Sequence, residues 1–233
     1  MSAWGRVLCV ARSAVNKSAG NAPGVPAPVD SLSPRGMATR DAVLDAAQRV
    51  FERIGFVDAR VELIAREAGV SYGTFYRYFA SKEDVFRELS TRLFTEVHHR
   101  EPSAHDMTPA QRLIAANRSY YQAYRRHARM MAIVEQVATF NEEFRQLRHE
   151  HRASLIDKTA GAIAHWQEQG RVRASLDPVM AARAMAAMVD HTLYLWLVQG
   201  EDADEDALLD TLDLMCVGAL GLEMPERASQ TFR

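Results

Sequence analysis

The chain has 233 residues, of which 48% are hydrophobic, and this is enough for a domain-sized apolar core. Its formal net charge is −2, so binding to nucleic acid has to come from a local cationic surface and not from the charge of the whole chain. The two cysteines, Cys9 and Cys216, lie far apart, which argues against a disulfide framework and favours a reducing compartment. Because no apolar run is long enough for a signal peptide or a membrane span, the sequence predicts a cytoplasmic protein.

Residues 1–36 are rich in Ser, Ala, Gly and Pro and have no apolar periodicity. They carry four basic residues against one acidic residue, Asp30. This composition predicts a disordered basic tail, and residues 229–233 are expected to form a second disordered tail. Two interpretations of the first tail stay open. It is either a solvated extension, with Met37 as a possible true start, or an arm that enters the minor groove of DNA.

Apolar residues at helical spacing begin near Thr39 and continue until Gly55, which is expected to end the first helix. A second, short segment over 61–68 ends at Gly69. Ser71 then caps a third segment, which carries an apolar face of its own. The pattern therefore predicts two short helices joined by a glycine turn, which is typical of a helix–turn–helix unit.

Beyond this unit, the sequence continues in helical periodicity to its C-terminal end. Ser81 caps a fourth helix that has acidic residues in its first turn. Thr108 and Asp177 are each followed by a proline, the pair that starts a helix. Five helices are expected after the fourth: 109–127, about 130–138, 141–169, 178–199, and one from the acidic cluster 202–206 to about 221.

The last two of these helices are apolar around most of their circumference. One face of each therefore needs a partner outside its own domain, and a dimer interface is the simplest partner. The chain shows no strand pattern and no internal repeat. The expected fold is all-α with about nine helices, an N-terminal helix-turn-helix head and a helical ligand-binding and dimerisation domain.

The third segment is built to meet a polar surface. Phe75 and Phe79 are expected to hold the helix from behind. The outward set combines hydroxyl groups, one cation and a glycine that permits close approach: Tyr72, Gly73, Thr74, Arg77 and Tyr78.

The stretch 61–82 closely resembles the DNA-binding signature of the TetR family. It contains the family's Ile-Ala, Ala-Gly-Val-Ser, Gly-Thr, Phe-Tyr-Arg-Tyr-Phe and Ser-Lys elements in order and spacing, and the resemblance is strong over about 39–98. It implies a three-helix DNA-binding head and a ligand domain whose last two helices form a four-helix bundle with a partner subunit. We therefore expect a DNA-binding domain at 37–82 and a ligand-binding and dimerisation domain at 83–228, of which 83–98 is the connecting helix.

Carried over position by position, the resemblance gives a set of expected DNA contacts. Thr74 and Tyr72 are expected to touch base edges or thymine methyl groups, whereas Tyr76 and Lys82 match phosphate contacts. For Tyr76, core packing stays open as an alternative. The full expected set is Arg60, Ser71, Tyr72, Gly73, Thr74, Tyr76 and Lys82.

One position departs from the family pattern. The family has Thr or Ser just before the second helix, where this chain has Ala59-Arg60. The usual cap is therefore missing, and Asp58 is a candidate to cap the helix one or two residues earlier. Arg60 is a candidate to contact a phosphate at the same place.

The sequence also offers candidates for an apolar ligand pocket in the second domain, because Met and aromatic side chains suit an adaptable cavity. For each of them, ordinary core packing is the alternative. The candidates are Tyr121, Tyr124, Met131, Phe140, Trp166, Met188 and His191, with Tyr120, Val134, Phe144 and Tyr194 as further members. Arg145, Arg148 and Arg152 form a stripe that either faces solvent or holds the phosphates of a nucleotide-tailed ligand.

We expect neither a metal nor a cofactor, because the histidines lack ligand spacing: His149 and His151 point to different helix faces. No phosphate loop, Gly-x-Ser-x-Gly elbow or Cys-x-x-Cys pair is present, so an enzyme is not expected. The resemblance implies a homodimeric regulator that is released from a palindromic DNA operator by a small, largely apolar effector. The alternative is a helical ligand-binding or protein-interaction module that binds no operator.

Overall fold

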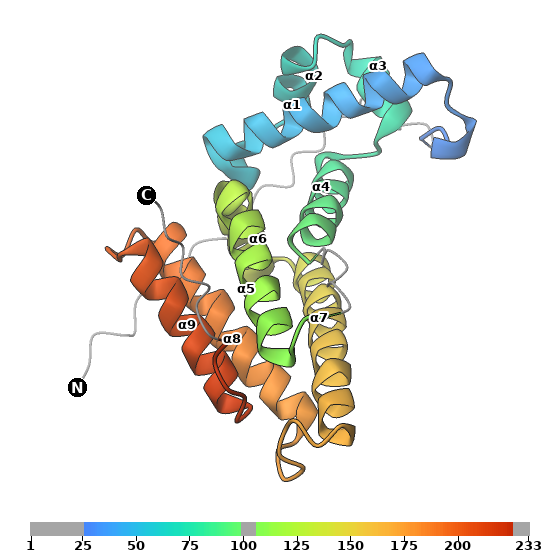
Figure 1. Cartoon of the computed structure of the whole chain (residues 1–233). Helices are drawn as coiled ribbons and strands as arrows, with labels where there is room; N and C mark the ends of the chain where they lie inside the picture. Colours follow the sequence, from blue (N-terminus) through green and yellow to red (C-terminus); the bar gives the residue numbers. More distant parts are fainter. Residues whose placement is uncertain (1–25, 99–105, 226–233) are drawn as a thin grey trace, which may run out of the picture.

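The computed structural model describes residues 26–98 and 106–225, and this part of the chain is entirely helical, with nine α-helices and one 3-10 turn (Figure 1). The predicted all-α fold is therefore confirmed. Within the described residues, no helix is both long enough and apolar enough to cross a membrane. The helices are α1 Pro34–Asp58, α2 Val61–Glu67, α3 Tyr72–Tyr78, α4 Lys82–Val97, α5 Pro109–Arg126, α6 Ala128–Phe140, α7 Glu142–Glu168, α8 Pro178–Leu197 and α9 Glu205–Ala219.

Helix α1 begins at Pro34, five residues before the expected start at Thr39. The reason is local, because Ser33 is an N-cap residue whose side chain accepts from the N–H of Gly36 at 3.2 Å, and Pro34 stands at the first helical position. Ahead of it lies the 3-10 turn η1, Val29–Ser31. The stretch 26–36 is thus structured, unlike the disordered tail expected for it, whereas 1–25 and 229–233 lie outside the described residues.

Gly55 interrupts α1 near its C-terminal end, as the sequence predicts. Gly55 has a φ of +77°, a left-handed conformation that breaks the helix before a last turn formed by 56–58. Helix α2 then begins at Val61, with Arg60 at the N-cap position and no side-chain hydrogen bond to the helix end. The candidate cap by Asp58 is therefore wrong, and α2 begins without a side-chain cap.

Helices α1, α2 and α3 gather at one end of the molecule, and α4 leads from this head into a body built from α5 to α9 (Figure 1). Within the body α7 packs along α8 and α5 along α9. Helix α5 begins with a capping box, in which Thr108 and Gln111 satisfy each other's backbone N–H groups. Helix α1 also rests on α6, so the head contacts the body at a second place besides α4.

Four phenylalanine rings fill the junction between the head and the body. Phe86 of α4 lies at the centre, with ring-centroid distances of 5.4 Å to Phe51, 4.7 Å to Phe56 and 4.8 Å to Phe144. All four side chains are buried, and they come from α1, α4 and α7. We call Phe51, Phe56, Phe86 and Phe144 the junction cluster. Because these closely packed rings belong to three helices, a displacement of one helix shifts the side chains of the other two.

Candidate DNA-binding surface and ligand cavity

The N-terminal end of α3 is held in shape by its own hydroxyl groups. The N–H of Thr74 donates to Ser71 Oγ at 3.1 Å, and the hydroxyl groups of these two residues lie 2.8 Å apart. Tyr72 is half exposed, and its hydroxyl oxygen lies 3.0 Å from that of Tyr76. Gly73 is exposed between them. The first turn of α3 therefore presents a preorganised set of hydroxyl groups around a residue without a side chain.

The other face of α3 is buried in the head. Phe75 and Phe79 pack inward as expected, but Tyr78 is only 7% exposed and does not belong to the outward set. Helical spacing gives the reason, because residues three and four apart share one face, which places Tyr78 with Phe75. Tyr76 is half-buried, and burial together with its hydrogen bond to Tyr72 raises its pKa to about 12. Its phenol therefore keeps its proton and stays available as a donor.

Lys82 has a different environment from the one that the resemblance implies. Its Nζ donates to three backbone carbonyl groups near the end of α1, those of Phe56 (2.8 Å), Val57 (3.2 Å) and Ala59 (2.9 Å). It also lies 4.6 Å from the centre of the Phe56 ring. An ammonium group has three donors, so this arrangement occupies all of them. Lys82 therefore ties the start of α4 to the α1–α2 junction, and a phosphate contact would require one of these bonds to break.

Several other cations of the head are engaged in ion pairs. Glu67 of α2 accepts from Arg49 at 3.1 Å and from Arg53 at 3.2 Å, and these two bonds lower the pKa of its carboxyl group. Arg60 and Arg77 are exposed. Of the seven expected contacts, Arg60, Ser71, Tyr72, Gly73, Thr74 and Tyr76 reach the surface to some degree at the α2–α3 side, and Lys82 turns away from it.

A partly buried ion pair that the sequence pattern did not indicate joins α1 to α4. The guanidinium of Arg40 forms a two-pronged bond with the carboxylate of Glu88 and lies 4.6 Å from the centre of the Phe79 ring. Arg92 extends the network with bonds of 2.9 Å to Glu88 and 3.1 Å to Asp41. These bonds fasten α4 to the head. Because Arg40 and Glu88 are 48 residues apart in the sequence, no local motif could indicate that they pair.

Loss of the α3 cap gives a first testable prediction. Ser71→Ala removes the acceptor of the Thr74 N–H, and we expect it to lower the free energy of unfolding by about 1 kcal/mol, as measured by urea denaturation. Ser33→Ala is the matched control, because it removes an equivalent cap from α1 at a similar cost. Only Ser71→Ala should also weaken DNA binding. Equal losses of DNA affinity in the two variants would contradict this role for the first turn of α3.

The body contains a small apolar cavity below the end of α4. It has a volume of about 60 Å³ and is bounded by α4, α5, α7 and α8. Its wall includes Val97 and His98 at the C-terminal end of α4, with Tyr120 and Asn117 of α5 as polar members. The remaining lining residues are Leu113, Ala116, Leu155, Thr159, Ala182, Met185, Ala186 and Val189. We call this space the inner cavity.

A second, more polar hollow adjoins the inner cavity and shares His98, Tyr120, Leu155 and Ala186 with it. Here the hydroxyl of Tyr120 donates to Asp190 at 2.7 Å, and Arg148 donates to Glu135 at 2.5 Å. Burial raises the pKa of both Tyr120 and Glu135. The expected arginine stripe divides at this point, because Arg148 and Arg152 line the hollow whereas Arg145 is exposed and pairs with Glu142.

Few of the expected pocket residues line these spaces. Tyr120 lines both, Met131 lines the polar hollow, and His191 and Tyr194 line a further hollow outside it. Phe140 is 55% exposed, which makes it a surface residue. The others are packed in the core or against it and line none of these spaces: Tyr121, Tyr124, Val134, Phe144, Trp166 and Met188. Within the described part of the chain, no group of His, Cys, Asp and Glu side chains is placed to hold a metal ion.

Comparison with known proteins places this geometry in a family. A family model described as bacterial regulatory proteins, tetR family, matches residues 43–89, and a model of the C-terminal domain of the transcriptional regulator EthR matches residues 113–220. The chain is 26% identical to the fatty acid metabolism regulator protein of Bacillus subtilis, over 76% of this chain and 93% of that protein. It is 26% identical to the regulator EthR of Mycolicibacterium smegmatis, over 70% of this chain and 76% of that protein.

Solved structures show the same fold. The fatty acid degradation regulator FadR from Bacillus halodurans has a TM-score of 0.66 and 24% identity, over 83% of this chain and 100% of that one. SmeT, the repressor of a multidrug efflux pump of Stenotrophomonas maltophilia, has a TM-score of 0.64 and 24% identity, over 82% of this chain and 98% of that one. Both halves of the chain thus match proteins of one kind, and the expectation of a non-enzyme is confirmed. The protein is a DNA-binding transcriptional regulator and belongs to the TetR family.

Proposed function

We propose that the protein is a homodimeric repressor that binds a palindromic operator through α3 and releases it when a small, largely apolar effector enters the inner cavity. The observation that supports this most strongly is the double role of α4. Its first half is fastened to the head by Lys82 and Glu88, whereas its last residues, Val97 and His98, form part of the cavity wall. One rigid helix thus connects the cavity to the DNA-binding head.

The size of the inner cavity gives the proposed switch its direction. Its volume of about 60 Å³ is well below the roughly 300–1,000 Å³ of typical ligand pockets. An effector of ordinary size therefore has to push the surrounding helices apart. Displacement of the end of α4 would turn the head through the junction cluster and change the separation of the two recognition helices. The effector would then favour a state that cannot span both half-sites.

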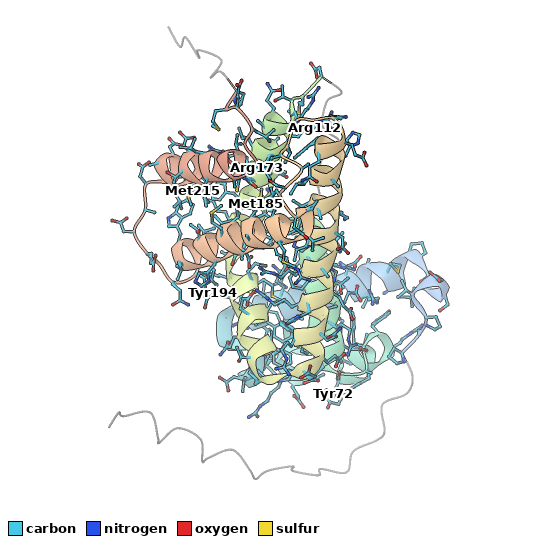
Figure 2. The ribbon with its side chains drawn as sticks, turned by 90° about the horizontal axis from the view of Figure 1, so that it is seen from below. Tyr72, Arg112, Arg173, Met185, Tyr194 and Met215 are labelled. Atoms are coloured by element: carbon cyan, nitrogen blue, oxygen red, sulfur yellow. The ribbon has the colours of Figure 1, made fainter. Side chains whose placement is uncertain are left out.

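Dimerisation through α8 and α9 is supported by their outer faces. Met180 on α8 and both Leu214 and Met215 on α9 are more than half exposed. Figure 2 labels Met215 on α9. Exposed apolar side chains of this size on two neighbouring helices indicate an association surface. A two-fold dimer would present two copies of α3, which is the reason to expect a palindromic operator. As a regulator of transcription the protein would act in the cytoplasm.

A charge on this face should separate the subunits. We expect Met215→Glu to convert the dimer to a monomer in analytical ultracentrifugation, because a carboxylate would be buried in the interface without a partner. Phe140→Glu is the matched control, since it places the same charge on an exposed apolar side chain away from α8 and α9. If Met215→Glu stayed dimeric and Phe140→Glu dissociated, the assignment of the interface would be wrong.

The proposed function is tested by selecting bound sequences from random duplex DNA with the full chain. We expect a palindrome whose half-sites lie about one helical turn apart, with affinity that falls steeply as salt rises. Recovery of sequences without a common motif would contradict operator recognition and favour the alternative of a ligand-binding or interaction module.

A further inference from the structure

Three hollows in the body adjoin one another in series, and we call the series the path. The inner cavity and the polar hollow share four lining residues, and the polar hollow in turn shares Glu135, Arg148 and Asp190 with the outer hollow bounded by α6, α7 and α8. Met185 lines the inner end of this path and Tyr194 its outer end, and Figure 2 shows the two at separate positions along α8. The path is apolar at its inner end and charged in its middle.

The charged middle contains two arginines, Arg148 and Arg152, whose bonds to Asp190 are long, although Arg148 also donates to Glu135 at 2.5 Å. Arg152 reaches Asp190 only at 3.3 Å, and the bond from Arg148 to Asp190 measures 3.5 Å. Charge-assisted bonds are normally about 2.7–2.9 Å, and each guanidinium carries five N–H donors. By contrast, Tyr120 holds the other oxygen of Asp190 at 2.7 Å. The two arginines therefore present more donor capacity to the hollow than Asp190 and Glu135 accept.

Asp190 is also placed so that an incoming anion can displace it from the two arginines. It lines the polar hollow and the outer hollow, so its carboxylate has space on both sides. An incoming anion can replace it as the partner of the arginines if Asp190 turns toward the outer hollow. With Asp190 in place, the two guanidinium groups of the hollow are balanced by two carboxylates, those of Glu135 and Asp190. Once Asp190 has turned away, one positive charge is in excess, and this favours an anion over a cation or an uncharged group.

Building on the proposed function, we propose that the effector is an anionic amphipath whose carboxylate binds Arg148 and Arg152 in place of Asp190, while its apolar chain passes the His98–Tyr120 pair into the inner cavity. The rings of that pair are stacked with centroids 6.1 Å apart. They lie at the boundary of the two spaces, so the chain has to part them. This displaces His98, which is the residue directly after α4.

The test compares three probes that share a ten-carbon chain and differ in the head group: decanoate, decanol and decylammonium. Binding to the full chain is measured by isothermal titration calorimetry. We expect decanoate to bind about 10- to 100-fold more tightly than the other two, because its bonds to the arginines are charge-assisted. Equal affinity for all three, preference for another head group, or no binding of decanoate would overturn the proposal.

Two variants separate head-group recognition from a general loss of structure. Arg152→Gln should abolish the preference for decanoate and leave the affinity for decanol unchanged. Arg145→Gln is the matched control on the same helix, because Arg145 is exposed, and it should change neither. Asp190→Asn, which removes the competing charge, should retain or increase the preference for decanoate. A variant Arg152→Gln that keeps the full preference would overturn the proposal.

The outcome is distinguishable from failure of the proposed function. Operator binding is measured without any probe. If the protein binds its operator but shows no head-group preference, only the assignment of the effector is wrong. A protein that prefers decanoate but selects no DNA sequence defeats the proposed repressor and leaves the head-group site standing.

Discussion

Phe86→Ala is expected to lower the free energy of unfolding by about 3–5 kcal/mol, the range measured for phenylalanine removed from a packed core. Phe86 is fully buried and contacts Phe51, Phe56 and Phe144 edge-on or tilted, so its loss leaves a cavity at the centre of the junction cluster. Urea denaturation followed by circular dichroism measures the change.

The functional consequence of Phe86→Ala should be as large as the structural one. Because the ring joins α4 to both α1 and α7, its removal loosens the head from the body. Under conditions in which the variant is still folded, we expect it to bind the operator but to release it only weakly when effector is added. Phe140→Ala is the control, since an exposed phenylalanine should contribute no more than about 0.5 kcal/mol. Similar destabilisation by the two substitutions would contradict a central role for the junction cluster.

Lys82→Ala is expected to cost about 2–3 kcal/mol of stability, because it leaves three carbonyl groups without their charged donor. The α1–α2 junction would then lose its tie to α4, and operator affinity should fall through misplacement of α2. Lys82→Met keeps the apolar part of the side chain near Phe56 and isolates the contribution of the ammonium group. Both variants should be destabilised, with Lys82→Met the milder of the two.

The same variants distinguish the observed arrangement of Lys82 from a phosphate contact. If Lys82 neutralised a phosphate, Lys82→Met would reduce the slope of log affinity against log salt by about 0.9 per subunit and leave stability nearly unchanged. The clamp seen in the structure predicts the opposite pattern, with lost stability and an unchanged slope. Thermal denaturation and operator titrations at several salt concentrations measure both quantities.

Local features of the head could be predicted from the sequence because they depend on neighbours in the chain. Gly55 and Gly69 adopt the left-handed conformations that end helices, and Ser71 caps α3 as expected. The error at Tyr78 is also instructive. A tyrosine hydroxyl favours an exposed face, but the three-residue spacing of Tyr78 from Phe75 places Tyr78 on the buried face of α3.

Contacts across the fold could not be predicted in this way. Lys82 is a family position whose environment is set by carbonyl groups more than twenty residues away, and Arg40 pairs with Glu88, which lies 48 residues further along the chain. The cavity shows the same limit. Met185 lines it and Met188 does not, although both lie on α8, because the packing of α8 against α7 fixes which face is turned inward. Residue type alone carries no information on that rotation.

Sequence recognition by α3 is tested by measuring how the double variant Tyr72→Ala/Thr74→Ala binds a selected palindromic duplex and a scrambled duplex of equal length. Both side chains lie in the exposed first turn of α3. We expect the wild-type chain to prefer the selected duplex by about 10³-fold or more. The variant should keep its stability and its weak binding to the scrambled duplex but lose this preference. An undiminished preference in the variant, or none in the wild-type chain, would contradict sequence recognition by α3.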